Sequence, residues 1–289
     1  MTKIIKEIIK EIIKIASYKI LGVKNYEKVR FWFAHKKIIN LEKPISFNEK
    51  ICYRKIFNQD PRFPVVADKF LVRDFVRDKV GEKYLSKVFA VFGNIDQVNF
   101  DVLPERFVVK STNGSGSDYI LIVDDKKKWT KEEFFSEIEN FFNTAYGKLT
   151  NEWWYEKIQP CIIIEERLFD LQNEIPLDYK FFVFHGRVEY IQVDYSRFTK
   201  HLRTFYDLNW MPQEFTLKYP KGKISEKPNC LEEMIKVAEI LGNDFDFIRV
   251  DLYCLQNSRI VFGEMTLAPE AGWGNFSPKE WDINLGQLW

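Results

Sequence analysis

Two long segments in the second half of the chain each have the pattern of two strands joined by a tight turn. Residues 178–198 alternate around His185-Gly186, and residues 247–266 do so around a turn near Asn257-Ser258. Hairpins pair antiparallel, and the helical patterns occupy separate stretches of the chain. This segregation predicts an α+β fold with antiparallel sheets rather than a doubly wound parallel sheet.

The second hairpin predicts a metal site. A symmetric loop on Asn257-Ser258 places Asp251 opposite Glu264, and Arg249 opposite Thr266. Two carboxylates facing each other across paired strands repel unless a cation lies between them. All-oxygen ligands of this kind select Mg²⁺ or Mn²⁺. The alternatives are a solvated face, or an ion network of the two acids with Arg249.

An earlier hairpin carries a loop of small polar residues. The sequence FVVKSTNGSGSDYILIV (107–123) matches neither common nucleotide fingerprint, because no lysine follows Gly114 or Gly116 and a strand, not a helix, comes next. From its own sequence, the loop is either a plain turn or a flap that holds phosphate. Several other apolar strands begin or end in charges: Lys110, Glu165, Glu166, Asp178 and Lys180. Together, acids for a metal, lysines for phosphate oxygens and a glycine flap indicate phosphoryl transfer.

The first 60 residues have helical patterns. Ser46 or Asn48 is expected to cap a helix that carries Glu49, and residues 65–81 predict one amphipathic helix ending at Gly81. Isoleucine pairs with interleaved lysines make residues 2–21 an amphipathic helix. That helix either packs on its own domain or lies on the inner membrane surface through residues 1–20.

Composition excludes several function classes. With 43 basic and 42 acidic residues the net charge is +1, so a nucleic-acid partner is not expected. Four scattered cysteines favour reduced thiols over a disulfide framework or zinc site. No apolar run reaches the ~18 residues of a membrane span. We therefore expect a cytoplasmic protein.

Seven motifs occur in an order and spacing that resemble one family: FNEKI, VADKFLVRDFV, LPERFVVKSTNGSGS, IEERL, DYKFFVFHG, FIRVDLY and FGEMT. The chain resembles the ATP-grasp superfamily, in its branch similar to the teichuronopeptide biosynthesis protein TupA. The resemblance implies two lobes whose antiparallel sheets clasp ATP. It implies a helical segment at 1–62 and an ATP-grasp domain at 63–289, with a flap lobe at about 104–166 and a metal-binding core lobe at about 167–289.

The resemblance also implies roles for individual residues. Those for the nucleotide are Lys69 and Lys110 at the phosphates, Asn113, Gly114, Ser115, Gly116 and Ser117 in the flap, Glu165, Glu166, Arg167 and Leu168 in the adenine hinge, and Asp178 and Lys180 in the same site. Arg249 and Lys180 would act in catalysis, and Asp251, Glu264 and Thr266 would bind Mg²⁺ or Mn²⁺. Many family members carry asparagine where Thr266 stands. The helical front of the chain also departs from ligases with a large acceptor domain there.

The function implied is an ADP-forming carboxylate–amine ligase of polysaccharide, capsule or cell-wall assembly. The acceptor would be a small-molecule or lipid-linked saccharide, with an amino acid as one candidate partner. A sugar kinase using the same site is the first alternative, and a glycosyltransferase of the same pathway is the second. A non-catalytic nucleotide-binding scaffold is a further reading. The loop after the metal strand is expected to bring Trp273 near the γ-phosphate.

Overall fold

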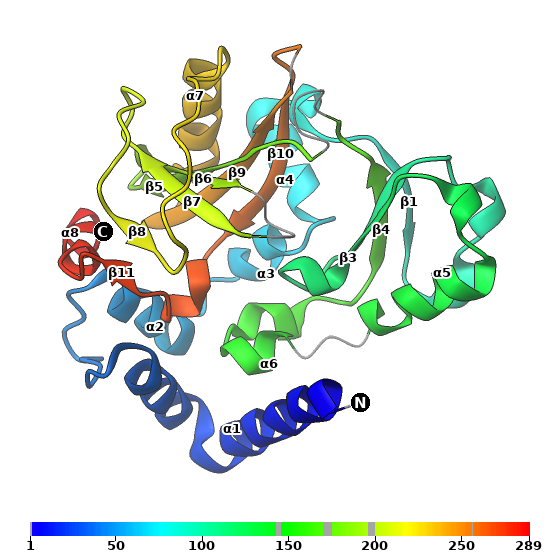
Figure 1. Ribbon diagram of the computed structural model, residues 1–289. Helices are drawn as coiled ribbons and strands as arrows, with labels where there is room; N and C mark the ends of the chain where they lie inside the picture. The colour runs from blue at the N-terminus through cyan, green and yellow to red at the C-terminus, as the bar shows by residue number, and fades with distance from the viewer. Residues whose placement is uncertain (1, 143–145, 170–174, 196–199, 256) are drawn as a thin grey trace.

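The computed structural model describes residues 2–142, 146–169, 175–195, 200–255 and 257–289. Two antiparallel sheets lie side by side and helices surround them (Figure 1). The predicted α+β class is confirmed.

The first sheet has the strand order β1-β4-β2-β3. Its strands are β1 (Val88–Phe92), β2 (Phe107–Ser111), β3 (Ile120–Val123) and β4 (Ile162–Glu166). One face packs on α5 (Lys131–Ile138), where Phe107 and Val109 join Phe134 and Ile138 in an apolar core. Because side chains alternate along a strand, Val108 and Lys110 point from the other face toward the second sheet.

The second sheet has the order β10-β9-β5-β6-β7. Its strands are β5 (Asp178–Phe184), β6 (Arg187–Tyr195), β7 (Leu202–Tyr206), β9 (Phe247–Cys254) and β10 (Ile260–Thr266), and a short pair, β8 (Thr216–Leu217) with β11 (Phe276–Ser277), lies nearby. Helix α7 (Leu231–Gly242) covers the apolar face, where a Cβ on Gly242 would lie 2.5 Å from Val183. The turn at His185-Gly186 has positive φ at both residues, as the predicted hairpin requires.

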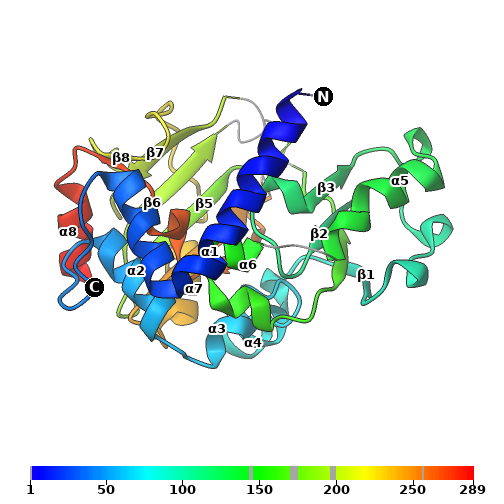
Figure 2. The same cartoon turned by 90° about the horizontal axis from the view of Figure 1, so that it is seen from below.

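The remaining helices pack below and beside the sheets. They are α1 (Thr2–His35), α2 (Phe47–Phe57), α3 (Arg62–Ala67), α4 (Val72–Val80), α6 (Tyr146–Thr150) and α8 (Trp281–Leu288). Ser46 caps α2 in a reciprocal capping box with Glu49, so Ser46, not Asn48, is the cap. Helix α1 bends at Gly22, and it runs across the underside against α6 and α2 (Figure 2). None of the described helices combines the length and apolar character needed to span a bilayer.

The prediction of a single helix over residues 65–81 is wrong, because two helices, α3 and α4, occupy this stretch. The chain breaks between α3 and α4 because the Asp68 carboxylate accepts hydrogen bonds from the backbone N–H groups of Phe70 and Leu71. Such local side-chain bonds favour a turn over a continuing helix. The break directs the backbone N–H of Lys69 to the carbonyl of Thr112, beside the glycine loop.

The expectation of four reduced thiols is also corrected. Cys230, at the start of α7, and Cys254, at the end of β9, form a disulfide across 24 residues of sequence. Cys52 and Cys161 are free. The pairing arises because α7 packs on β9, and the sequence alone carries no sign of that contact.

Candidate active site

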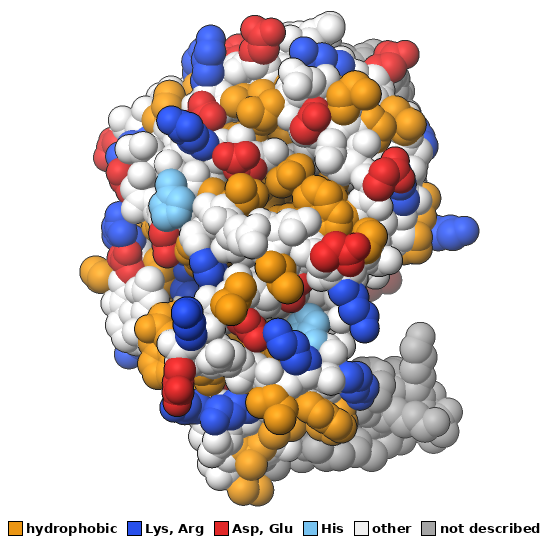
Figure 3. All heavy atoms as spheres, turned by 90° about the vertical axis from the view of Figure 1, so that its left-hand side faces the viewer, with side chains coloured by type: hydrophobic (Ala, Val, Ile, Leu, Met, Phe, Trp, Pro, Cys, Tyr) orange, Lys and Arg blue, Asp and Glu red, His pale blue; other side chains and the backbone are white. Residues whose placement is uncertain are grey.

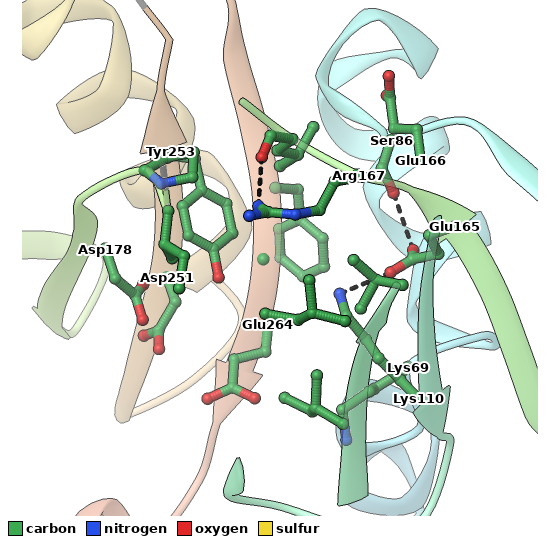
Figure 4. Close-up of a pocket in the computed structure, with 18 residues that line it drawn as sticks. Lys69, Ser86, Lys110, Glu165, Glu166, Arg167, Asp178, Asp251, Tyr253 and Glu264 are labelled. Atoms are coloured by element: carbon green, nitrogen blue, oxygen red, sulfur yellow. Dashed lines mark hydrogen bonds and ion pairs between the residues drawn. The ribbon is translucent and has the colours of Figure 1, made fainter. Parts of the chain in front are cut away.

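A cleft between the two sheets is lined by side chains from both (Figure 4). Apolar walls come from β2, β3 and β10, and charged groups come from β2, β4, β5, β9 and β10. The cavity at the centre of the cleft measures about 100 Å³, and the cleft opens to solvent beyond it.

Lys110 occupies the wall formed by the first sheet. Its Nζ lies 2.6 Å from an oxygen of Glu165, which also accepts hydrogen bonds from Arg73 and Ser86 at 3.0 and 2.8 Å. Burial raises the pKa of Glu165, but Lys110, Ser86 and Arg73 outweigh burial, so the pKa lies below its ordinary value. The lysine is thus held in a fixed position facing the second sheet.

Lys69 reaches the glycine loop from the break between α3 and α4. Its Nζ donates to the carbonyl of Gly114. Burial lowers the pKa of Lys69 to about 8, although Glu264 across the cleft acts in the opposite direction. Inside the loop, Asn113 is buried and its Oδ1 accepts from the Ser111 hydroxyl. Ser115 lies within hydrogen-bonding reach of Tyr146 and Tyr155.

The segment expected to form the adenine hinge lies at the edge of the cleft. Glu166, Arg167 and Leu168 all line it. Glu166 pairs with Arg259, which lies just before β10. Arg167 donates to Asp124 at 2.8 Å and to the carbonyl of Leu168 at 2.7 Å. Glu165 differs from its neighbours, because its side chain anchors Lys110 instead.

The second sheet presents a row of charged side chains on its cleft face. Lys180 on β5 is paired with Asp251 on β9, and Asp251 is paired with Glu264 on β10. Arg249 also points to this face: its Nε and Nη2 donate to Asp251 at 2.7 Å each, and Nη2 reaches Glu264 at 3.1 Å. Burial raises the pKa of Asp251 to about 6, while Arg249 and Lys180 act against that rise.

The predicted facing of Asp251 and Glu264 is confirmed, but not through the symmetric loop from which it was predicted. Near the loop Phe262 faces Leu252, one residue out of the predicted register. A β-bulge at Gly263 adds one residue to β10 and restores the register from Glu264 onward. A Cβ on Gly263 would lie 3.0 Å from the carbonyl oxygen of Asp251, so the bulge favours glycine.

The donor set suits Mg²⁺ held together with phosphate oxygens. Among the described residues, no three acidic, histidine or cysteine side chains form a metal-binding group, and the ion network weighed as an alternative is present. Mg²⁺ at phosphate sites, however, is commonly held by only one or two carboxylates, with phosphates and water as its other ligands. Asp251 and Glu264 fit that requirement. Thr266, by contrast, accepts from Arg249 at 2.9 Å and donates to Glu264 at 3.3 Å.

Two other expected site residues have different surroundings. Lys180 is buried, and its Nζ donates to both Asp178 and Asp251. It therefore lies beside Asp251 on the same face of the sheet but is not among the residues that line the cleft. Trp273 was expected near the γ-phosphate, and this is wrong. Its Nε1 donates to Glu27 of α1 at 2.8 Å, and Arg30 and Lys55 lie over its ring.

Several residues of the site escaped the sequence analysis. Arg73 and Ser86 fix Glu165, yet Arg73 is 92 positions away from it in the chain. Glu152 and Tyr155, which are buried, and the half-buried Tyr146 form a group beside the glycine loop. No local pattern marks these residues, because only folding brings them together.

Comparison with known proteins gives a family match over most of the chain. The model of the TupA-like ATP-grasp family matches residues 49–289. A search of curated protein sequences found no significant match.

Some solved structures are similar at low identity. D-alanine–D-alanine ligase from Bacillus anthracis with ATP has 15% identity, a TM-score of 0.42, and coverage of 70% of this chain and 54% of that one. VanG D-Ala:D-Ser ligase from Enterococcus faecalis has 14% identity, a TM-score of 0.43, and coverage of 70% of this chain and 52% of that one. N5-carboxyaminoimidazole synthetase from Staphylococcus aureus with ADP has 10% identity, a TM-score of 0.41, and coverage of 70% of this chain and 45% of that one. The chain spans about half the length of these structures.

Proposed function

Because the chain belongs to the TupA-like ATP-grasp family, we propose that it is an ATP-dependent, ADP-forming carboxylate–amine ligase. The observation that carries the proposal is the charge arrangement of the cleft. Lys69 and Lys110 face Asp251 and Glu264 across it (Figure 4). Cations on one wall and metal-binding acids on the other suit a magnesium-bound triphosphate.

The reaction has two steps. A carboxylate oxygen of the first substrate attacks the γ-phosphorus of ATP, which breaks the bond to ADP and yields an acyl phosphate. An amine then attacks the acyl carbon, loses a proton and releases inorganic phosphate, so that an amide remains. Mg²⁺ would neutralise charge on the transferring phosphoryl group.

The residues of this chain would bind and orient the reactants. Lys110, fixed by Glu165, and Lys69 would contact phosphate oxygens. Arg249 lies beside both metal-binding acids, where its guanidinium would stabilise charge on the transferring group. Lys180 would hold Asp251 ionised and in place.

For the substrate, we propose a uronic acid or amino acid in the assembly of a bacterial surface polysaccharide, as the family resemblance implies. The protein would act in the cytoplasm. A glycosyltransferase is less well supported. Asp244-Phe245-Asp246 has the D-x-D spacing of a nucleotide-sugar motif, but Asp244 pairs with Lys79 and Asp246 with Arg54, outside the cleft lining.

An isotope experiment separates the ligase from the kinase. The carboxylate of the candidate acid is labelled with ¹⁸O, and the protein is given ATP, Mg²⁺ and an amine. A ligase transfers one labelled oxygen to inorganic phosphate, and hydroxylamine in place of the amine yields a hydroxamate. A kinase leaves phosphate bound to a sugar hydroxyl, and that product would contradict the proposal. The Glu264→Gln protein serves as the control for contaminating activity.

A further inference from the structure

The second half of α1 presents apolar side chains to solvent. Val29, Trp32 and Phe33 follow the i, i+3, i+4 spacing of one helix face, and Ile38 lies just beyond the helix. Trp32 is 46% exposed, Phe33 61% and Ile38 82%. With Lys28 and Ile39 these residues line a groove of about 360 Å³.

The opposite face of the same helix is the one that packs on the protein. Tyr26 and Phe31 are buried, and the Tyr26 hydroxyl donates to the carbonyl of Leu149 at 3.0 Å. Glu27 is buried in contact with Lys55 and Trp273. The inward face therefore fixes the rotation of the helix, and the outward apolar residues are not needed to hold it in place.

The segment of chain that carries the apolar groove is rich in exposed lysines. Six lysines between residues 17 and 45 are exposed: Lys19, Lys24, Lys28, Lys36, Lys37 and Lys43. The only exposed acid in that segment is Glu42, because Glu27 is buried. Lys36 lies over the rings of both Trp32 and Phe33, and Lys37 pairs with Glu49. The whole chain has a net charge of only +1, so this segment is far more basic than the chain as a whole.

We propose that the surface formed by Lys28, Val29, Trp32, Phe33, Lys36 and Ile38 binds the face of an anionic lipid bilayer. Aromatic and aliphatic side chains enter the boundary between headgroups and acyl chains, and surrounding lysines contact anionic headgroups. Lysines beside a shallow apolar groove, with few acids near them in the chain, suit a lipid surface more than a folded partner, whose interface would need matched groups. In Figure 3, hydrophobic side chains gather at the lower end of the molecule with basic side chains beside them.

This surface differs from the membrane contact expected of residues 1–20. The isoleucine stripe of that segment consists of side chains at 4–13, which lie outside the side chains that the structure describes. The proposed surface lies after the bend at Gly22 and depends on described residues alone.

Co-sedimentation of the full chain with vesicles tests the proposal. Vesicles of phosphatidylcholine with about 30% phosphatidylglycerol, at low salt, are compared with phosphatidylcholine alone. We expect the protein to pellet with the anionic vesicles and to be released by high salt, because exposed charges are then screened. Trp32→Ser/Phe33→Ser and Lys28→Glu/Lys36→Glu should each weaken binding at least tenfold.

A matched control removes exposed apolar groups elsewhere. Met211 and Ile224 are 60% and 67% exposed, and Met211→Ser/Ile224→Ser should bind within twofold of the unmodified chain. Circular dichroism of each protein verifies folding. The proposal is overturned if the unmodified chain stays in the supernatant with anionic vesicles. It is also overturned if both α1 variants bind as well as the control, or if they only abolish self-association in sedimentation velocity without any vesicle binding.

Discussion

Arg249 forms a two-point ion pair with Asp251, with Nε–Oδ1 and Nη2–Oδ2 distances of 2.7 Å each. Its Nη2 also reaches Glu264. In the ligand-free protein a guanidinium therefore compensates the two acids that the family resemblance assigns to a metal.

Replacing Arg249 with methionine should make the fold dependent on Mg²⁺. Removal of one partner from a buried ion pair costs about 3–5 kcal/mol, because Asp251 and Glu264 are left close together without this cation. Millimolar Mg²⁺ should then raise the melting temperature of Arg249→Met more than that of the unmodified protein. Arg259→Met, which breaks the more exposed pair with Glu166, is the control. Equal magnesium responses in all three proteins would contradict the assignment.

Loss of either acid should weaken nucleotide binding that depends on metal. In Asp251→Asn or Glu264→Gln, one carboxylate is left to hold Mg²⁺ with the phosphates, and we expect the affinity for a Mg·ATP analogue to fall at least tenfold, about 1.4 kcal/mol. Calorimetry with and without chelator measures this effect. Asp244→Asn, outside the cleft lining, should behave as the unmodified chain does. Unchanged affinity and turnover in both site variants would exclude these acids as metal ligands.

A methyl group on Gly114 should displace the glycine loop. A Cβ there would lie 2.5 Å from the Tyr119 ring, and overpacking of this kind costs about 1–3 kcal/mol. Because the carbonyl of Gly114 accepts from Lys69, Gly114→Ala should also lower affinity for the Mg·ATP analogue, by about tenfold. Adding Tyr119→Ala should restore part of it. Gly93→Ala, where nothing lies within 4 Å, is the control, and a Gly114→Ala protein that binds as well as Gly93→Ala would contradict the steric argument.

Glu152 should make stability fall as pH rises. Burial is the main reason that its pKa is raised from 4.5 to about 7, against the effect of Lys55, while Tyr146 and Glu27 are its other ionisable neighbours. Between those two pH values the folded state binds a proton that the unfolded state does not. The stabilisation is complete below about pH 4.5 and is lost as pH rises through 7, a change of about 3 kcal/mol.

Urea unfolding of Glu152→Gln and the unmodified chain at pH 5 and pH 8 measures this effect. The amide cannot ionise, so the free energy of unfolding of the variant should lack this decrease with pH. All other titrating groups are common to both proteins and cancel in the comparison. Parallel pH dependences would show that Glu152 ionises normally in the folded state.

The sequence predicts those parts of the site whose signal is local. The hairpins, the cap at Ser46, and the charges near the ends of β2 and β4 at Lys110 and Glu165 all follow from short patterns. Contacts between distant segments leave no such pattern. Arg73 has the appearance of a surface charge on an amphipathic helix, yet it is buried against Glu165. Trp273 follows β10 in the chain, but its indole donates to Glu27 of α1, more than 200 residues earlier.

The bulge at Gly263 lets the two halves of β10 pair with β9 in different registers. Phe262 faces Leu252 on the loop side and Glu264 faces Asp251 beyond the bulge, so Gly263 is the one residue of this stretch without a partner of its own in the ladder. Deletion of Gly263 would therefore remove the bulge and leave Glu264 opposite Asp251 in a regular ladder. A gap at this position in an alignment of relatives would mark the loss of the bulge and not the loss of the acid pair.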